Sequence, residues 1–266
     1  NIFQTTEKTN GNDVRGVNIG MKLGQNIESG SYDNKLIFSV VTNPYVAKAV
    51  MTEGPDFNVK LKALGSRTDK IEYFKKSTVA PAAFMNAVNI EDEESECEIK
   101  FWLNSTDKTA YYYTESEKVY LNTNSSKMFE NSKTLSDPEY SDQKIKNILE
   151  LDLSSFDTSK VTNMSGMFQY TGWYGAGLNL DISSFNTRQV TNFDKMFNVM
   201  SKTKTIYVGE NFIVNSGAST TDMLKGNFQL IGGAGTAYDV NHVDGEYARI
   251  DNPAAGKPGY FTAKTP

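Results

Sequence analysis

The sequence is poor in the residues on which most site chemistry depends. Its 266 residues include one cysteine, Cys97, and one histidine, His242. A structural zinc site takes about four Cys or His ligands, and a Ser/His/Asp triad needs a positioned imidazole. Cys97 lies in the acidic run "EDEESECE", residues 91–98, where the carboxylates disfavour a reactive thiolate, and the run lacks the spacing of a calcium loop. We therefore expect no metal, no cofactor and no catalytic thiol.

A surplus of basic residues and long apolar runs are also missing. The net charge is -5, and Lys and Arg are scattered singly, so we expect no nucleic-acid partner. The longest apolar stretch, residues 36–41, is interrupted by Ser39 and is far shorter than the roughly 20 residues of a membrane span. The chain begins at Asn1 without a signal motif, which predicts a mature or excised fragment of a longer protein.

What the sequence does contain is an internal duplication. The segment "LDLSSFDTSKVTNMSGMF", residues 151–168, is followed by "LDISSFNTRQVTNFDKMF", residues 180–197. The two segments are offset by 29 residues and are identical at eleven of eighteen positions. A period between about 20 and 50 residues indicates stacked repeats, each too small to bury its own apolar face.

Each repeat changes its hydrophobic period along its length. Alternation in "LELDL", "LNLDI" and a degenerate third copy, "KTIYV", predicts strands with one buried face. The spacing of apolar residues in "VTNMSGMF" predicts a short helix, with Thr162 or Asn163 as its N-cap. We expect these residues to be buried in one column: Leu151, Leu153, Phe156, Met167, Phe168, Leu180, Ile182, Phe185, Met196, Phe197, Ile206 and Val208.

These repeats resemble those of the BspA-like leucine-rich repeat bacterial surface proteins. Residues 99–129, which end in "SSKMF", look like the segment that precedes the repeats in that family, and residues 230–262 are similar to its closing segment. The resemblance implies a β/α solenoid, a bacterial, exported, cell-surface protein, and no catalytic residues to carry over. The chain departs from the family's pattern in the inserted "SDPEYSDQ" and in the long loop "QYTGWYGAG".

The predicted fold class is α+β, a short leucine-rich-repeat-like β/α solenoid with a C-terminal cap, preceded by a small all-β module. The all-β module covers residues 1–66, because short β-branched runs there are divided by Gly, Asn and Pro. A β-rich lead-in follows at 67–118, with a possible helix at "PAAFMNAV". The solenoid covers 119–231 and the cap 232–266.

Two groups of residues are candidates for binding. Tyr170, Trp173 and Tyr174 lie among glycines in the extra loop "QYTGWYGAG", and exposed aromatics there either pack back or bind a sugar or protein. In stacked parallel strands, outward residues form rows about 4.8 Å apart. The first row is Glu150, Asn179 and Thr205, and the second is Asp152, Asp181 and Tyr207. The face would be acidic, and either solvated or suited to a cation or basic partner.

Three functions are consistent with these features. The first is a non-catalytic, adhesion-type protein of the bacterial cell surface that binds an extracellular protein or glycan of a host or neighbouring cell. The second is a structural stalk or spacer that displays other domains. The third is an extracellular glycan-active enzyme, which would need two carboxylates about 5 to 10 Å apart in a cleft.

Overall fold

The computed structural model of the protein describes residues 47–66, 68–131, 145, 148–173 and 177–264. The chain divides into two units, residues 1–46 and 47–266, and the first lies outside the described residues. The predicted all-β module of residues 1–66 therefore falls mostly outside them. Its described part, residues 47–66, contains strand β1 (Ala49–Val50) and the helix α1 (Gly54–Leu64).

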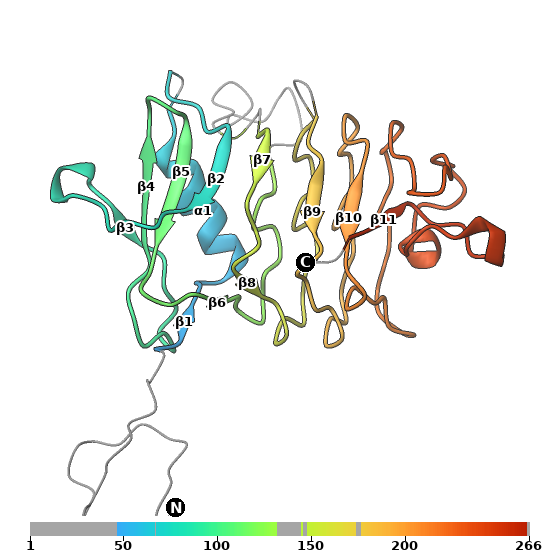
Figure 1. The fold of residues 1–266 in the computed structure, drawn as a ribbon, viewed down its shortest axis with the longest axis horizontal. Helices are drawn as coiled ribbons and strands as arrows, with labels where there is room; N and C mark the ends of the chain where they lie inside the picture. Colours follow the sequence, from blue (N-terminus) through green and yellow to red (C-terminus); the bar gives the residue numbers. More distant parts are fainter. Residues whose placement is uncertain (1–46, 67, 132–144, 146–147, 174–176, 265–266) are drawn as a thin grey trace, which may run out of the picture. The chain divides into compact units, whose positions relative to one another are not determined.

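The described residues of the second unit form a mixed α/β structure with one α-helix and three sheets (Figure 1). The largest sheet has five strands, in the order β3 (Val88–Asn89), β4 (Lys100–Asn104), β5 (Thr109–Tyr113), β2 (Tyr73–Lys76) and β7 (Glu150–Leu151). A second joins β1 to β6 (Val119–Tyr120) and β8 (Phe156–Asp157), and a third joins β9 (Leu180–Ile182), β10 (Ile206–Val208) and β11 (Phe261–Ala263). Short 3-10 turns are η1 (Ala83–Met85), η3 (Gly245–Tyr247) and η4 (Pro253–Ala255). All strand pairs are parallel except β3–β4 and β4–β5.

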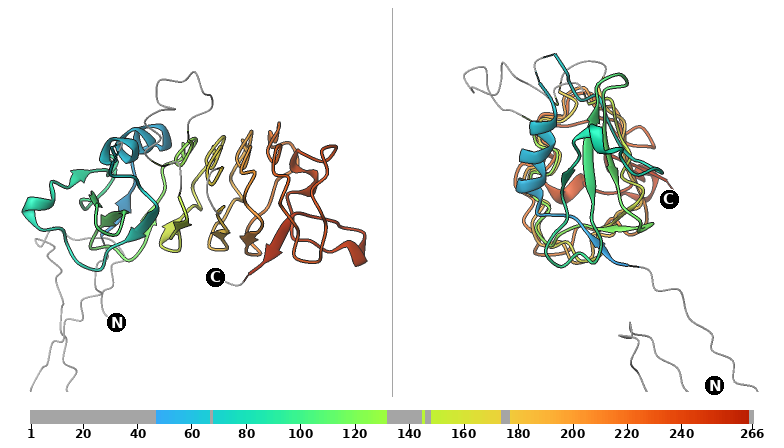
Figure 2. Two further views of the ribbon diagram at one scale, coloured as in Figure 1. Left: turned by 90° about the horizontal axis from the view of Figure 1, so that it is seen from above. Right: turned by 90° about the vertical axis from the view of Figure 1, so that its left-hand side faces the viewer.

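Neighbouring repeats are joined through the backbone of their turn segments, which lie side by side in Figure 2. Every second N–H of one turn segment donates to a carbonyl of the next repeat. Examples are Lys127 to Ser165 at 2.9 Å, Gly166 to Asp194 at 2.8 Å and Lys195 to Thr221 at 3.0 Å. We call this set of bonds the turn ladder; it joins four segments, residues 123–131, 162–170, 191–199 and 219–225.

The predicted leucine-rich-repeat β/α solenoid is wrong. Between residues 119 and 231, the described part of the chain contains no helix, and its strands belong to three separate sheets rather than one continuous sheet. The N–H groups in between those of the turn ladder close tight turns, as in Met167 to Met164 at 3.1 Å. Asn163, a proposed N-cap, accepts a bond from Ser165 N at 3.0 Å within such a turn. The segment therefore has no N–H groups left for a helix.

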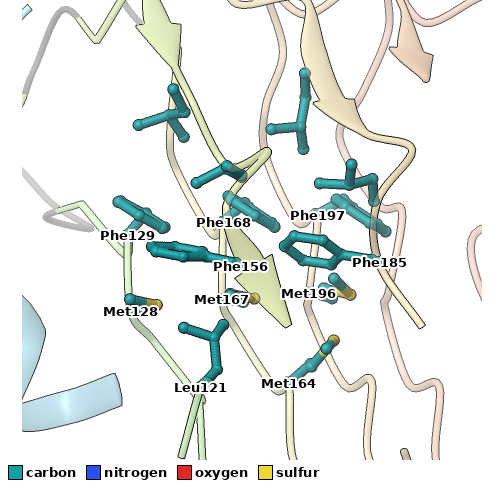
Figure 3. Packing of buried hydrophobic residues seen from close by; sticks show 14 of the residues in the cluster. Leu121, Met128, Phe129, Phe156, Met164, Met167, Phe168, Phe185, Met196 and Phe197 are labelled. Carbon is teal, nitrogen blue, oxygen red and sulfur yellow. The ribbon is translucent and has the colours of Figure 1, made fainter. Parts of the chain in front are cut away.

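The hydrophobic core runs through the repeats as a stack of aromatic rings. All twelve residues predicted to be buried are buried, and they belong to one core cluster. Figure 3 labels Phe156, Met167, Phe168, Phe185, Met196 and Phe197 among them. The ring of Phe168 lies parallel to those of Phe129, at 5.7 Å and 2°, and Phe197, at 5.9 Å and 1°. Equivalent side chains of successive repeats thus contact one another, which is why the apolar positions recur.

The helix α1 closes the first end of the turn ladder, where no preceding repeat donates N–H groups to the carbonyls of residues 123–131. Gly54 N donates to Asn124 O at 2.8 Å. The amide of Asn58 donates to Met128 O at 3.2 Å and to Glu130 O at 2.9 Å. A Cβ at position 54 would lie 2.2 Å from Ser126 O, so the helix can approach this closely only with glycine there.

The segment after residue 231 closes the other end, where N–H groups have no following repeat. Asp222 N donates to Asp244 Oδ1 at 2.8 Å and Leu224 N to Val243 O at 2.7 Å. The N–H of Gly226 donates to the Tyr238 hydroxyl at 2.9 Å. The turn ladder is thus covered by α1 at one end and by the segment after residue 231 at the other, so neither end offers an open strand edge.

Candidate functional site

The outward side chains of the strands form the candidate site. In the large sheet, Phe74, Tyr112 and Leu151 point into the core, so their neighbours along each strand point outward. Figure 1 shows β4, β5, β2, β7, β9 and β10 following one another across the same side of the molecule. We call this surface the outer face; the residues used below are Tyr73, Lys75, Trp102, Tyr111, Glu150, Asp181, Tyr207 and Lys264.

One group on the outer face combines a tyrosine, a lysine and a carboxylate. Glu150 of β7 is in register with Tyr73 of β2. Lys75 Nζ lies 3.1 Å from Glu150 Oε1 and 5.3 Å from the centre of the Tyr73 ring. The hydrogen bond to Glu150 is the main reason why the pKa of Lys75 is raised. On the other side of β2, Tyr111 is in register with Lys75 and stacks on Trp102 at 5.8 Å and 26°.

A second group repeats this composition on the last sheet. Asp181, Tyr207 and Thr262 are in register across β9, β10 and β11. Lys264 Nζ lies 2.5 Å from Asp181 Oδ2 and 5.5 Å from the centre of the Tyr207 ring. Burial alone would raise the pKa of Asp181, but hydrogen bonds from Lys264 and Ser183 outweigh it and the pKa is lowered. Both strand carboxylates of the outer face are therefore paired with lysine.

Neither of the two predicted rows of outward residues is found complete in the structure. Asp181 and Tyr207 are brought together, whereas Glu150 lies beside Tyr73, from a strand outside the repeats. Asp152 follows β7 and accepts bonds from the N–H and hydroxyl of Ser154 at 3.1 and 2.6 Å. Asn179 is exposed just before β9. The expected row of bare carboxylates is replaced by two groups in which lysine compensates the charge.

The start of the aromatic loop is held by the repeats. The rings of Tyr170 and Trp173 meet at 5.9 Å and 61°, and both side chains are half-buried. Tyr170 N donates to Asn198 O at 2.9 Å, and the Thr171 hydroxyl donates to Phe129 O at 2.7 Å. Tyr174 lies outside the described residues. The described part of the loop thus offers an edge-to-face aromatic pair rather than two free rings.

An apolar loop between β2 and β4 is not among the features predicted from the sequence. Residues 77–90, which we call the projection, contain no charged side chain. Val79 is 70% exposed, Phe84 79%, Met85 41% and Val88 42%. The signal was present as fourteen uncharged residues. The helix considered for "PAAFMNAV" within it, residues 81–88, is wrong, because the structure has only the 3-10 turn η1 there.

The base of the projection is polar and braced. Asn89 Nδ2 donates to Glu91 Oε1 at 2.7 Å, and Lys100 Nζ donates to Asn89 Oδ1 at 2.8 Å. Lys100 also lies 3.0 Å from Glu98, and its hydrogen bond is the main reason why the pKa of Glu98 is lowered. Glu91 Oε2 accepts Ile99 N at 2.9 Å. Among the described residues, no group of three or more His, Cys, Asp or Glu could hold a metal ion.

Comparison with known proteins gives one match. Residues 123–244 match the model of a family described as "Mycoplasma protein of unknown function, DUF285". This segment contains the four segments of the turn ladder and ends within the region that closes it. No curated protein and no solved structure matches the chain. None of the helices in the described part of the chain has the length and apolarity of a membrane span.

Proposed function

We propose that this chain is a non-catalytic, adhesion-type interaction protein of a bacterial cell surface, which binds an extracellular protein or glycan through the outer face. The observation that carries the proposal is the repeated group of tyrosine, lysine and carboxylate in two separate sheets. The resemblance to BspA-like surface proteins supports a surface location, and the match to a Mycoplasma family supports a bacterial source.

The chemistry of the two groups suits a ligand that is both polar and partly apolar. A tyrosine ring offers an apolar surface, and the neighbouring ammonium and carboxylate donate and accept hydrogen bonds at positions held by their ion pair. A glycan presents C–H faces and hydroxyls in the same combination, and so does a peptide with aromatic and polar side chains. Two similar groups along an open face favour an extended ligand with repeated units.

The proposal is tested by probing an array of extracellular glycans and matrix proteins with the 266-residue chain. For any component that binds, Tyr207→Ala and Lys75→Ala should each weaken binding by about tenfold or more, because each removes part of one group. Lys160→Ala removes an exposed lysine outside both groups and is the matched control. Trp173→Ala should cost about 2 kcal/mol if the aromatic loop contributes to the same site. Asp152→Asn should mainly change the salt dependence.

Unchanged affinity in Tyr207→Ala and Lys75→Ala would place binding elsewhere on the chain and remove the outer face from the proposal. The second candidate function is a structural stalk or spacer, and it is favoured by the closure of both ends of the turn ladder. If the chain is a stalk, none of these substitutions should change its binding to any component of the array.

A glycan-active enzyme has less support on the outer face. Retaining and inverting glycosidases need a carboxylic acid whose pKa is raised so that it can donate a proton. The pKa of Asp181 is lowered instead, and Glu150 is held by Lys75. These two carboxylates are therefore better suited to holding lysine than to acid catalysis.

A further inference from the structure

The outer face is not one continuous sheet. β7 is the last strand of the large sheet, and β9 is the first strand of the third sheet. The two strands are close neighbours, and Figure 1 shows β9 following β7 across the outer face. In the described part of the chain, however, no strand pairing and no backbone hydrogen bond joins them. We call this interruption of the sheet the break.

The two repeats that carry β7 and β9 are nevertheless joined elsewhere. Their turn segments, residues 162–170 and 191–199, are connected by the turn ladder. The four bonds run from Met164 N to Asn192 O, Gly166 N to Asp194 O, Phe168 N to Met196 O and Tyr170 N to Asn198 O, at 2.9, 2.8, 2.9 and 2.9 Å. The first full repeat is therefore attached to the second through its turn segment but not through its strand.

The repeat period supplies the bonds that would close the break. The offset of 29 residues aligns Leu151 with Leu180, and Asp152 with Asp181. In the parallel pattern that joins β9 to β10, Leu180 N donates to Thr205 O at 3.1 Å. The same pattern at the break would join Leu151 N to Asn179 O, Asp181 N to Leu151 O and Leu153 N to Asp181 O. None of these three N–H groups donates to an acceptor among the described residues.

Closing the break would not disturb the bonds that already hold the two strands. Asp152 N donates to Phe74 O of β2 at 2.9 Å, so the backbone groups of Leu151 and Leu153 point the other way, toward β9. On β9, Leu180 bonds to β10, which leaves the backbone groups of Asp181 pointing toward β7. A closed ladder is thus compatible with the present strand pairings.

Each strand at the break is instead drawn toward its other neighbour. At the start of β7, the N–H groups of Leu149 and Glu150 both donate to Glu72 O, at 2.7 and 3.4 Å. Just before β9, a Cβ at Gly177 would lie 2.1 Å from Lys202 O, so glycine lets the chain approach the segment before β10 closely. These contacts explain why two nearly identical repeats are apart on the outer face.

The break also separates the two groups of tyrosine, lysine and carboxylate. The first group is built on β2 and β7, on one side of the break. The second is built on β9, β10 and the residue after β11, on the other side. No strand pairing among the described residues therefore fixes the distance between the two groups.

We propose that the break is a hinge, at which the outer face alternates between the open arrangement of the structure and a closed one with the three additional bonds. The turn ladder is the pivot, because it joins the same two repeats in both arrangements. Water competes for exposed N–H and C=O groups, so three such bonds change the free energy little and neither arrangement excludes the other. The hinge changes the spacing of the two groups, and it does not depend on the ligand proposed for them.

The first test is backbone amide relaxation dispersion of the 266-residue chain, which detects motion between microseconds and milliseconds. The amides of Leu151, Leu153 and Asp181 should show exchange with one common rate, because they gain and lose their acceptors together. The amides of the paired strands β4 and β5, away from the break, should show none. In hydrogen exchange, the same three amides should be about 100-fold or more less protected than that of Leu180, which keeps its acceptor in both arrangements.

A disulfide across the break is the second test. In a Cys97→Ser background, Asp152→Cys with Asp181→Cys places thiols at two positions that closure brings into register, where a disulfide is permitted. Cross-linking should abolish the exchange and protect the three amides. The matched control, Asp181→Cys with Tyr207→Cys, cross-links strands that are already paired in register and should leave the exchange unchanged.

Three results would overturn the proposal. The first is a wild-type chain without exchange at the three amides. The second is protection of these amides equal to that of Leu180, because the sheet would then be continuous. The third is a pair at positions 152 and 181 that does not cross-link while the control pair does, or that cross-links without abolishing the exchange. Thermal unfolding of the reduced and oxidised forms distinguishes a locked hinge from a damaged fold.

Discussion

At the scale of single residues, the turn segments depend on left-handed backbone positions. Three repeats each have two residues with positive φ, four positions apart. The pairs are Gly166 and Tyr170, both at 61°, Lys195 and Val199 at 58° and 57°, and Asp222 and Gly226 at 53° and 86°. Glycine adopts this conformation freely, whereas a β-branched residue is strained in it. The turn ladder thus holds Val199 in an unfavourable conformation.

Val199→Gly should therefore raise the free energy of unfolding by about 1 kcal/mol. Relief of backbone strain of roughly 1 to 3 kcal/mol outweighs the larger entropy of a glycine in the unfolded chain, about 0.5 to 1 kcal/mol. Urea denaturation measures the change. Gly166→Ala, at another left-handed position with φ 61°, is the control for the opposite change and should lower stability. A Val199→Gly variant no more stable than the wild type would show that Val199 packing is worth more than the strain.

Asp251 is a buried carboxylate that holds the closing segment together. Its oxygens accept bonds from the N–H of Ala234, Thr236 and Gly259 at 2.9, 3.0 and 3.1 Å, and from the Thr236 hydroxyl at 2.6 Å. Burial would raise the pKa of Asp251, but these hydrogen bonds outweigh it and the pKa is lowered. A carboxyl group with a lowered pKa stabilises the folded state above its unfolded pKa, about 3.9, and loses this effect as the pH falls through its folded pKa.

Asp251→Asn should therefore destabilise the protein at pH 7 by about 2 to 3 kcal/mol, because an amide NH2 would face N–H donors that then have no acceptor. Below pH 4 the wild type should lose stability more steeply than the variant. Thermal unfolding from pH 2 to pH 7 measures both effects. Parallel pH profiles for the two proteins would contradict the role assigned to this carboxylate.

At the scale of elements, the sequence predicted the strands but not what connects them. Alternation in "LELDL", "LNLDI" and "KTIYV" located β7, β9 and β10 because one face of each is buried. The helices were wrong because apolar residues three and four positions apart also fit two successive tight turns. The spacing of apolar residues does not show whether a backbone N–H bonds within its own segment or to the next repeat. Here every second N–H of a turn segment donates to a carbonyl of the next repeat.

Phe168 tests the packing between elements. Its side chain is fully buried between Phe129 and Phe197, so Phe168→Ala should leave a cavity and cost about 3 to 5 kcal/mol of unfolding free energy. Phe84→Ala, on the exposed projection, removes the same atoms and should cost close to nothing. Chemical denaturation of both variants gives the comparison. Equal small effects would mean that the stack of rings does not stabilise the repeats.

At the scale of the whole molecule, the candidate site could be predicted only in part. Glu150, Asp181 and Tyr207 belong to repeat strands, so periodicity showed that they face outward. Lys75 and Lys264, which compensate the carboxylates, come from β2 and from the residue after β11. Neither lies near its partner in sequence, and parallel pairing between distant segments leaves no local pattern. Without the lysines, the outer face was predicted to be acidic.

The closing segment gives the last prediction, because it covers an end that the repeats leave open. Deleting residues 232–266 removes the acceptors of the N–H groups of Asp222, Leu224 and Gly226, which leaves the last segment of the turn ladder as an open edge. It also removes Phe261, whose ring contacts those of Phe197 at 5.7 Å and Phe212 at 5.3 Å.

The truncated chain should therefore aggregate irreversibly through this open edge and the uncovered apolar end. Light scattering after size exclusion measures this directly. Phe261→Ala, which keeps the backbone acceptors and removes only the ring, should stay folded with lower stability, by about 3 to 5 kcal/mol. A truncated protein that is monomeric and unfolds cooperatively would show that residues 232–266 are an appendage, and that the turn ladder is stable without acceptors for its last N–H groups.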